Sequence, residues 1–254
     1  MEIFLIILGL ICGSFISALS ARYEKPQTMF TERSKCPKCK HTLGFWDLFP
    51  IFSYIFLQGK CRYCKKPISL RYPLIELATV IIFLLPAIFK SGFSNYELIL
   101  YLLISIILIT ILVIDLETMY VPDYLIYIGI FVGLVWSVLE YCLEGQNYIN
   151  LSLGPVLGGG VFLILVLVSR EKWMGIGDIG IGTILGLILA YPLILVNLFL
   201  SFLIGGIIGL GLILTKKATR KTKIPLGPFL IFGFFLTYFW GEAILNWYLS
   251  FIYL

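Results

Sequence analysis

Charged residues are scarce in this chain. Asp, Glu, Lys and Arg together make up 13% of its 254 residues, whereas an average soluble domain has about 25%. Hydrophobic residues make up 60%, and the mean hydropathy is +1.00. These values exclude an ordinary soluble globular protein and predict a polytopic membrane protein.

The sequence also lacks internal repeats, low-complexity stretches and a basic segment before its first apolar run. Without that basic segment, residues 3–21 are predicted to span the membrane rather than to form a cleavable signal peptide. The net charge of +5 could suggest nucleic-acid binding. The Lys and Arg residues are gathered in a few loops, however, so we interpret them as topology determinants and expect no nucleic-acid partner.

Apolar runs of about 17 to 22 residues predict an all-α protein with about eight transmembrane helices. The sixth run is short and ends at Tyr191-Pro192, and the eighth is interrupted by Gly241-Glu242. The predicted spans are residues 3–21, 74–89, 98–114, 124–139, 151–168, 179–190, 193–214 and from 229 onward.

Positive charge lies almost entirely on one side of this predicted bundle. The loops 22–73, 115–123, 169–178 and 215–228 hold 18 of the 19 Lys and Arg residues. By the positive-inside rule that side faces the cytoplasm, and both termini lie outside. The predicted organisation is a first transmembrane helix (1–21), a small cytoplasmic domain (22–73) and a transmembrane core (74–254).

Four of the six cysteines form two Cys-x-x-Cys pairs in the cytoplasmic segment, Cys36 with Cys39 and Cys61 with Cys64. This spacing, in a reducing compartment, favours a zinc-ribbon-like domain with four thiolates on a structural zinc over a disulfide framework. A domain of about 40 residues has too little core to fold unaided. A redox or non-binding role is the alternative. The single histidine, His41, is interpreted as a neighbour of the metal ligands rather than as a ligand.

One aspartate stands at the head of an apolar run. Asp178 ends the stretch Gly175-Ile176-Gly177-Asp178, and an unpaired charge at membrane depth costs on the order of a few kcal/mol or more. The two glycines leave room for an extended peptide or another backbone near this carboxylate. Asp115 ends the third predicted span, so we expect both carboxylates at the cytoplasmic boundary.

Two aspartates within hydrogen-bonding reach cannot easily both ionise. One can stay protonated and polarise a carbonyl while the other activates water, which hydrolyses a peptide bond without a metal. Asp123, after Pro122, competes with Asp115 for this role, but as an N-cap of the fourth span it would only support the site. Glu76, which opens the second span, is expected to pair with a basic neighbour or to line the site. For Asp115, an ordinary charged residue ending a span is the alternative.

The ordered motifs resemble those of type IV prepilin peptidases, membrane-embedded aspartic proteases with a Gly-x-Gly-Asp signature. The resemblance covers almost the whole chain and implies that Asp115 and Asp178 are the catalytic pair. It implies a multi-pass protein of the bacterial inner membrane that cleaves the basic leader of prepilins or pseudopilins at the cytoplasmic face, for type IV pili or secretion. It also implies N-methylation of the new terminus with S-adenosylmethionine. The motifs are Gly13-Ser14-Phe15, the two cysteine pairs, Ile68-Ser69-Leu70-Arg71-Tyr72-Pro73-Leu74-Ile75-Glu76, Ile114-Asp115, Pro122-Asp123, Gly175-Ile176-Gly177-Asp178 and Ile224-Pro225-Leu226-Gly227-Pro228-Phe229.

The chain departs from the pattern of this family at two positions. Gly180 stands where the family usually has Lys, and Ser17 stands where it usually has Asn, near the segment linked to methylation. Neither change removes a catalytic carboxylate.

Two other classes of function are considered. An ion- or proton-coupled transporter would place its acids near the bilayer midplane, whereas these acids fall at one boundary. A zinc-ribbon scaffold without catalysis would leave the Gly-x-Gly-Asp stretch without a function.

Overall fold

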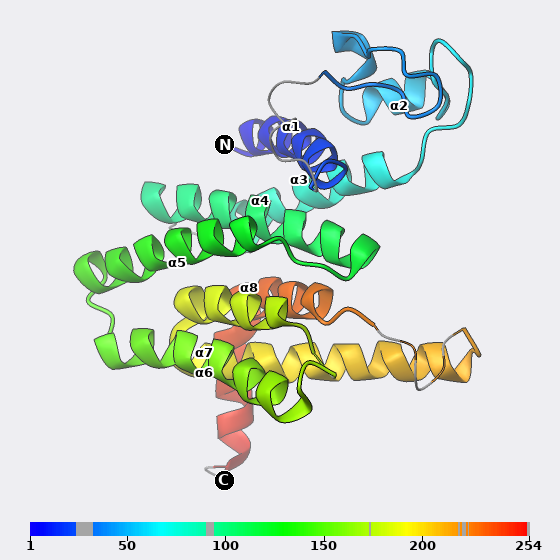
Figure 1. Ribbon diagram of the computed structural model, residues 1–254. Coiled ribbons are helices and arrows are strands. Elements are labelled where there is room, and N and C mark those ends of the chain that lie inside the picture. Colours follow the sequence, from blue (N-terminus) through cyan, green and yellow to red (C-terminus); the bar gives the residue numbers. More distant parts are fainter. Residues whose placement is uncertain are drawn as a thin grey trace. The chain divides into compact units, whose positions relative to one another are not determined.

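The computed structural model describes residues 1–23, 33–89, 94–172, 174–217, 219, 222 and 224–252. In this part of the chain, regular secondary structure is entirely helical (Figure 1), apart from isolated bridges between Lys35 and Thr42 and between Lys60 and Pro67. The elements are α1 (Glu2–Ser20), η2 (Phe45–Asp47), α2 (Phe52–Phe56), α3 (Arg71–Phe89), α4 (Asn95–Thr118), α5 (Asp123–Leu143), α6 (Tyr148–Ser169), α7 (Ile176–Leu214) and α8 (Gly227–Ile252).

Seven helices are long and apolar enough to cross a membrane, namely α1 and α3 to α8. Large apolar side chains also stand exposed on their flanks, among them Phe4, Phe131 and Ile207, and an apolar exterior of this kind requires a lipid environment. The chain is therefore a multi-pass membrane protein, as its composition predicted.

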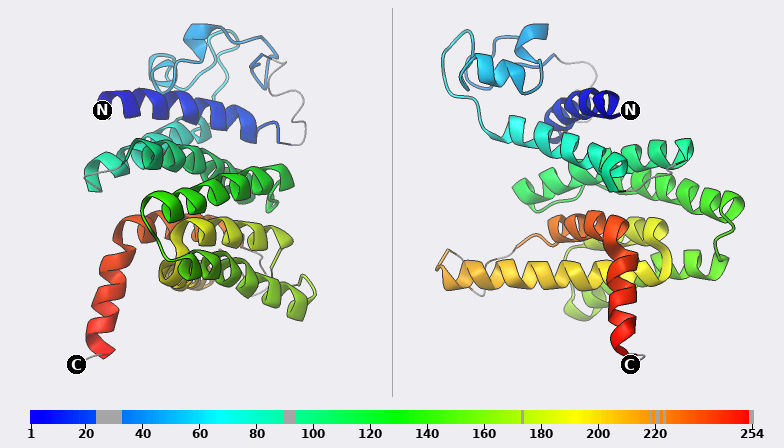
Figure 2. Two further views of the ribbon diagram at one scale, coloured as in Figure 1. Left: turned by 90° about the vertical axis from the view of Figure 1, so that its left-hand side faces the viewer. Right: turned by 180° about the vertical axis from the view of Figure 1, so that it is seen from behind.

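The 39 residues of α7 form two helical segments rather than one. Ala190 (φ 54°, ψ −177°) and Tyr191 (φ −86°, ψ 139°) have non-helical backbone angles, and the chain doubles back there (Figures 1 and 2). The predicted sixth and seventh spans correspond to residues 176–189 and 192–214. The prediction of an all-helical protein with about eight spans is confirmed.

The last helix is also irregular. Figure 2 shows α8 changing direction between its orange and red parts. The predicted interruption at Gly241-Glu242 lies within this helix, where an added Cβ at Gly241 would lie 2.8 Å from Cγ2 of Thr237.

The described residues divide into two compact units, Met1–Leu98 and Ile99–Leu254. In the first unit α1 packs on α3 with their backbones in contact. A Cβ added to Gly13 would lie 2.6 Å from Cα of Glu76, and one added to Gly9 would lie 2.9 Å from Cα of Val80. Small residues allow helices in lipid to approach this closely, where van der Waals packing replaces the hydrophobic effect as the attraction between them.

In the second unit, α7 packs against α5, α6 and α8. Ile181, Ile184 and Leu185 on it are fully buried. The contact with α6 is glycine to glycine, because an added Cβ at Gly158 would collide with the carbonyl oxygen of Gly182. This packing fixes where α7 begins relative to the neighbouring helices of the unit.

We expect Gly158→Val to lower the unfolding temperature of the purified protein in detergent, because overpacking a tight interface costs about 1–3 kcal/mol. Gly160→Val is the matched control on the same helix, since an added Cβ there meets no atom within 4 Å. Equal unfolding temperatures for the two variants would contradict the close α6–α7 contact.

Candidate active site and metal centre

Asp115 lies in the last turn of α4 and is buried, with 5% of its surface exposed. The helix ends just beyond it, where Met119 adopts a positive φ of 55° and its N–H donates to the carbonyl oxygen of Asp115 at 2.9 Å. Pro122 then fixes an extended backbone before α5 begins. The acid is therefore held at the end of a spanning helix rather than in its middle.

Asp178 lies in the first turn of α7 and is also buried, at 9% exposed. Its Oδ2 accepts a hydrogen bond from the backbone N–H of Gly175 at 3.2 Å, and its own N–H donates to the carbonyl oxygen of Gly175 at 3.2 Å. The positive end of the helix dipole favours a carboxylate at this position. These interactions offset part of the cost of burying the acid.

The two acids lie close together in the second unit. Gly227, the first residue of α8, lies against the Asp115 carboxylate, and Asp178 is near enough for its charge to act on the same carboxylate. A Cβ at Gly227 would lie 2.5 Å from Oδ2 of Asp115 and 3.0 Å from Cδ1 of Ile181, three residues after Asp178. The end of α4 and the starts of α7 and α8 thus meet at the acids.

Of the two signature glycines, only Gly175 faces open space. A Cβ added to Gly177 would lie 2.8 Å from Cβ of Val121, so the loop before α5 fills that side. A Cβ at Gly175 would meet only the backbone nitrogen of Gly177, at 3.9 Å. The space expected next to Asp178 is therefore present at Gly175 and taken up at Gly177 by the protein's own chain.

The structure gives reasons for the unusual Gly180 and for the position of Asp123. A Cβ at Gly180 would lie 2.5 Å from Cγ2 of Ile126 on α5, so a lysine side chain has no room there. Asp123 is exposed and is the first helical residue of α5, with Pro122 rather than Asp123 at the N-cap. Its burial therefore differs from that of Asp115 and Asp178.

Comparison with known proteins gives two matches to family models, one in each unit. Residues 7–89 match the bacterial peptidase A24 N-terminal domain, and residues 102–210 match the type IV leader peptidase family. The chain belongs to the type IV leader peptidase family. The second match includes both Asp115 and Asp178 but ends before α8, which supplies Gly227.

Relatives of similar length support this assignment. The chain is 31% identical to the prepilin leader peptidase/N-methyltransferase of Aeromonas hydrophila over 228 residues, covering 89% of this chain and 78% of that protein. It is 30% identical to the proteins of the same name from Pseudomonas aeruginosa, with 97% and 92% covered, and from Bacillus subtilis, with 97% of each covered. No solved structure matches the chain.

The four cysteines predicted to bind zinc come together in the first unit. The Sγ atoms of Cys36, Cys39, Cys61 and Cys64 all lie within 4.8 Å of one another, and those of Cys36 and Cys64 are 4.0 Å apart. A tetrahedral zinc with Zn–S bonds of about 2.3 Å requires sulfur atoms about 3.8 Å apart. The cluster fits zinc with little adjustment.

The two cysteine turns have the same hydrogen-bond pattern. The Cys36 N–H donates to the carbonyl oxygen of His41, and the Cys61 N–H donates to that of Lys66, both at 2.9 Å. Lys40 and Lys65, which follow the second cysteine of each turn, both have φ 59°. Hydrogen bonds from the backbone N–H groups of Cys39 and Lys38 and from the neighbouring thiols lower the pKa of the Cys36 thiol, which favours a thiolate at this cysteine.

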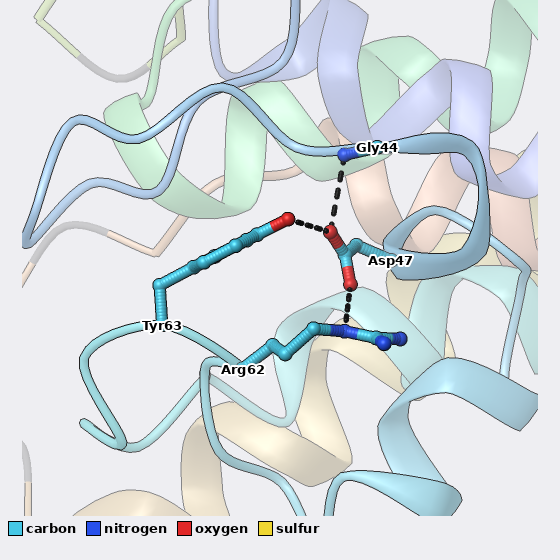
Figure 3. A network of polar contacts seen from close by, with 4 residues as sticks. All are labelled: Gly44, Asp47, Arg62 and Tyr63. Atoms are coloured by element: carbon cyan, nitrogen blue, oxygen red, sulfur yellow. Dashed lines mark hydrogen bonds and ion pairs between the residues drawn. The ribbon is translucent and has the colours of Figure 1, made fainter.

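Asp47 joins the stretch after the first cysteine turn to the second turn, as Figure 3 shows. It accepts hydrogen bonds from Nε of Arg62 at 2.7 Å, from the Tyr63 hydroxyl at 3.2 Å and from the Gly44 N–H at 3.1 Å. Burial alone would raise the pKa of Asp47, but the bonds from Gly44, Arg62 and Tyr63 outweigh it and hold the pKa below its usual value. His41 stacks on Tyr63, with ring centroids 3.7 Å apart, and lies outside the four-cysteine cluster.

Glu76 has a partner that the sequence did not reveal. It is 6% exposed, and its Oε2 accepts the backbone N–H of Ile51 at 2.7 Å. Ile51 is the N-cap residue of α2 and has a φ of 59°. The acid thus joins the cysteine segment to α3 through a backbone amide, instead of through the basic neighbour expected from the sequence. The sequence showed only that an acid opens an apolar span, and gave no indication that Ile51 is its partner.

We expect the purified protein to contain about one zinc ion per chain and Cys36→Ser to lose it, because three thiolates and a hydroxyl bind zinc less tightly. Metal analysis by mass spectrometry, with limited proteolysis of the cysteine segment, measures both effects. Cys142→Ser, which changes an exposed cysteine outside the cluster, is the control. Full zinc content in Cys36→Ser would contradict the four-cysteine site.

Proposed function

We propose that the chain is an aspartic endopeptidase that removes the basic leader from prepilins or pseudopilins, with Asp115 and Asp178 as the catalytic pair. The observation that carries this proposal is the convergence of these two buried acids at the end of α4 and the start of α7. The third buried acid among the described residues, Glu76, lies in the first unit, where it accepts a hydrogen bond from the backbone N–H of Ile51. The names of the relatives support the choice of substrate.

The pair would act by sharing one proton. The protonated carboxyl donates a hydrogen bond to the scissile carbonyl, and the ionised one takes a proton from the attacking water. The tetrahedral intermediate then collapses as the leaving amine receives a proton. The backbone amide of Gly175 would orient Asp178, because it donates a hydrogen bond to that carboxylate. Gly227 would position Asp115 by lying directly against its carboxylate.

The position of the acids suits a prepilin. Such a substrate carries a basic leader in the cytoplasm followed by an apolar helix in the bilayer, so its scissile bond would arrive at the boundary where α4 ends and α7 begins. The open face at Gly175 leaves room for an extended peptide. We place this boundary, with the cysteine segment, on the cytoplasmic side of the bacterial inner membrane by the positive-inside rule.

The second half of the relatives' name suggests a second activity. We propose that this chain also methylates the new N-terminus of its product, with S-adenosylmethionine as the methyl donor. Zinc on Cys36, Cys39, Cys61 and Cys64 would have a structural role, because four thiolates leave no open coordination position for catalysis.

We expect Asp115→Asn and Asp178→Asn each to reduce leader cleavage about 100-fold or more, since a positioned acid or base contributes about 10²–10⁴-fold. Mass spectrometry of a prepilin incubated with the purified protein measures the trimmed product. Glu117→Gln, which changes an exposed acid near the same end of α4, should cleave normally. Retained cleavage in either Asp variant would overturn the pair assignment.

We expect Gly227→Ala to reduce cleavage about tenfold or more while the protein stays folded, because the new methyl group would displace the Asp115 carboxylate and loss of geometry is costly in catalysis. Gly206→Ala is the matched control, since an added Cβ there meets nothing within 4 Å. Equal cleavage rates for the two variants would show that Gly227 does not position Asp115.

A further inference from the structure

The cysteine segment exposes a cluster of aromatic side chains. Phe45, Trp46, Phe49, Phe52 and Phe56, which we call the aromatic patch, are between 43% and 82% exposed. The ring centroids of Phe45 and Trp46 are 5.7 Å apart, and those of Phe49 and Phe52 are 5.6 Å apart. All of the patch except Phe45 lines one groove. A contiguous apolar surface outside the spanning helices indicates an interaction site.

The short helix α2 turns one side toward the cysteine segment and the other side outward. The hydroxyl of Tyr54 donates to the carbonyl oxygen of Ile68 in the segment at 3.3 Å. Phe52 and Phe56 are four residues apart and therefore share the opposite side of the helix. The rings of the patch thus face away from the segment that carries them.

The aromatic patch lies beside the start of a spanning helix. The backbone N–H of Ile51, the residue before Phe52, donates to Oε2 of Glu76 at 2.7 Å. Glu76 is five residues beyond the start of α3 at Arg71, which is about 7.5 Å along the helix axis. Both helices that flank the segment, α1 and α3, are long and apolar enough to span a membrane. The patch is therefore close to the level at which α3 would enter the bilayer.

The charge of the cysteine segment indicates what could cover the patch. Residues 33–70 include eight Lys or Arg but a single acid, Asp47, and Arg62 lines the groove together with the aromatic rings. Four thiolates on one zinc ion would offset only two of these positive charges. Such a surface repels a basic prepilin leader or a second copy of the same segment. It attracts the anionic headgroups of the cytoplasmic leaflet.

We propose that the aromatic patch docks the cysteine segment on an anionic bilayer surface, with its rings at the level of the lipid headgroups. The inference rests on the cytoplasmic placement of the segment proposed above and does not depend on the peptidase activity. Aromatic rings are favoured at the interface between membrane and water. Burial of apolar side chains together with attraction to anionic lipids is how segments lying on a membrane bind to it.

Tryptophan fluorescence of the full-length protein in lipid nanodiscs tests this docking. The probe is phosphatidylglycerol brominated near the headgroup end of its acyl chains, because bromine quenches a tryptophan only in close contact. Comparison with Trp46→Phe isolates the signal of Trp46 from the other tryptophans. We expect Trp46 to lose fluorescence in this anionic lipid and to keep it in brominated phosphatidylcholine. No quenching in either lipid would overturn the docking, and equal quenching in both would overturn the anionic surface as the partner.

Phe56→Glu removes a ring from the patch with little risk to folding, since Phe56 is 82% exposed. It should leave the zinc content unchanged and lower the ratio of docked to undocked segment about tenfold or more. Gln58→Glu is the matched control, because it adds the same negative charge to an exposed polar side chain two residues away. It should be quenched like the wild type. Equal quenching in the two variants would overturn the role of the patch.

Two further measurements separate the other outcomes. A Trp46 that is shielded from acrylamide in water but not quenched by either brominated lipid would show that protein covers the patch, and would overturn the docking. Leader cleavage by the same preparations tests the proposed function independently. A protein that trims prepilin without quenching of Trp46 would overturn the docking alone. Quenching without trimming would support the docking and overturn the endopeptidase.

Discussion

Burying two carboxylates in an apolar helical protein is the constraint on which the second unit depends. A carboxylate away from water needs hydrogen-bond donors, and within a spanning helix the backbone amides are already used. Only the first turn of a helix has amides to spare. Gly175 supplies such an amide to Asp178, and the first residue of α8, Gly227, lies against the carboxylate of Asp115. The acids can therefore be buried at the ends of the helices, which is also where a water-dependent hydrolysis would have access to water.

Close helix packing brings those ends together. Gly158 and Gly182 allow α6 and α7 to touch backbone to backbone, and Gly180 allows Ile126 of α5 to pack directly on α7. Since lipid provides no hydrophobic force between helices, such contacts depend on van der Waals packing of surfaces with complementary shapes. The same packing leaves no room for a side chain at position 180, because Ile126 occupies that space.

The first unit is held together differently, because its cysteine segment is too small to fold around a hydrophobic core of its own. Two turns with the same hydrogen-bond pattern bring four sulfur atoms to a spacing that suits zinc. Asp47 holds the second turn through Arg62 and Tyr63. Glu76 then ties the segment to α3 through Ile51.

The sequence by itself determined the features that are local along the chain. Apolar runs predicted the spanning helices, including the short one before Tyr191-Pro192, and the cysteine spacing predicted the four-sulfur cluster, because helix period and turn geometry extend over only a few residues. Only the tertiary structure decided that Gly227 lies against Asp115, that Val121 fills the space at Gly177 and that Glu76 bonds to Ile51. These contacts join residues far apart in the chain, and their partners are backbone atoms or apolar side chains. No residue type or spacing marks such a partner, so packing alone selects it.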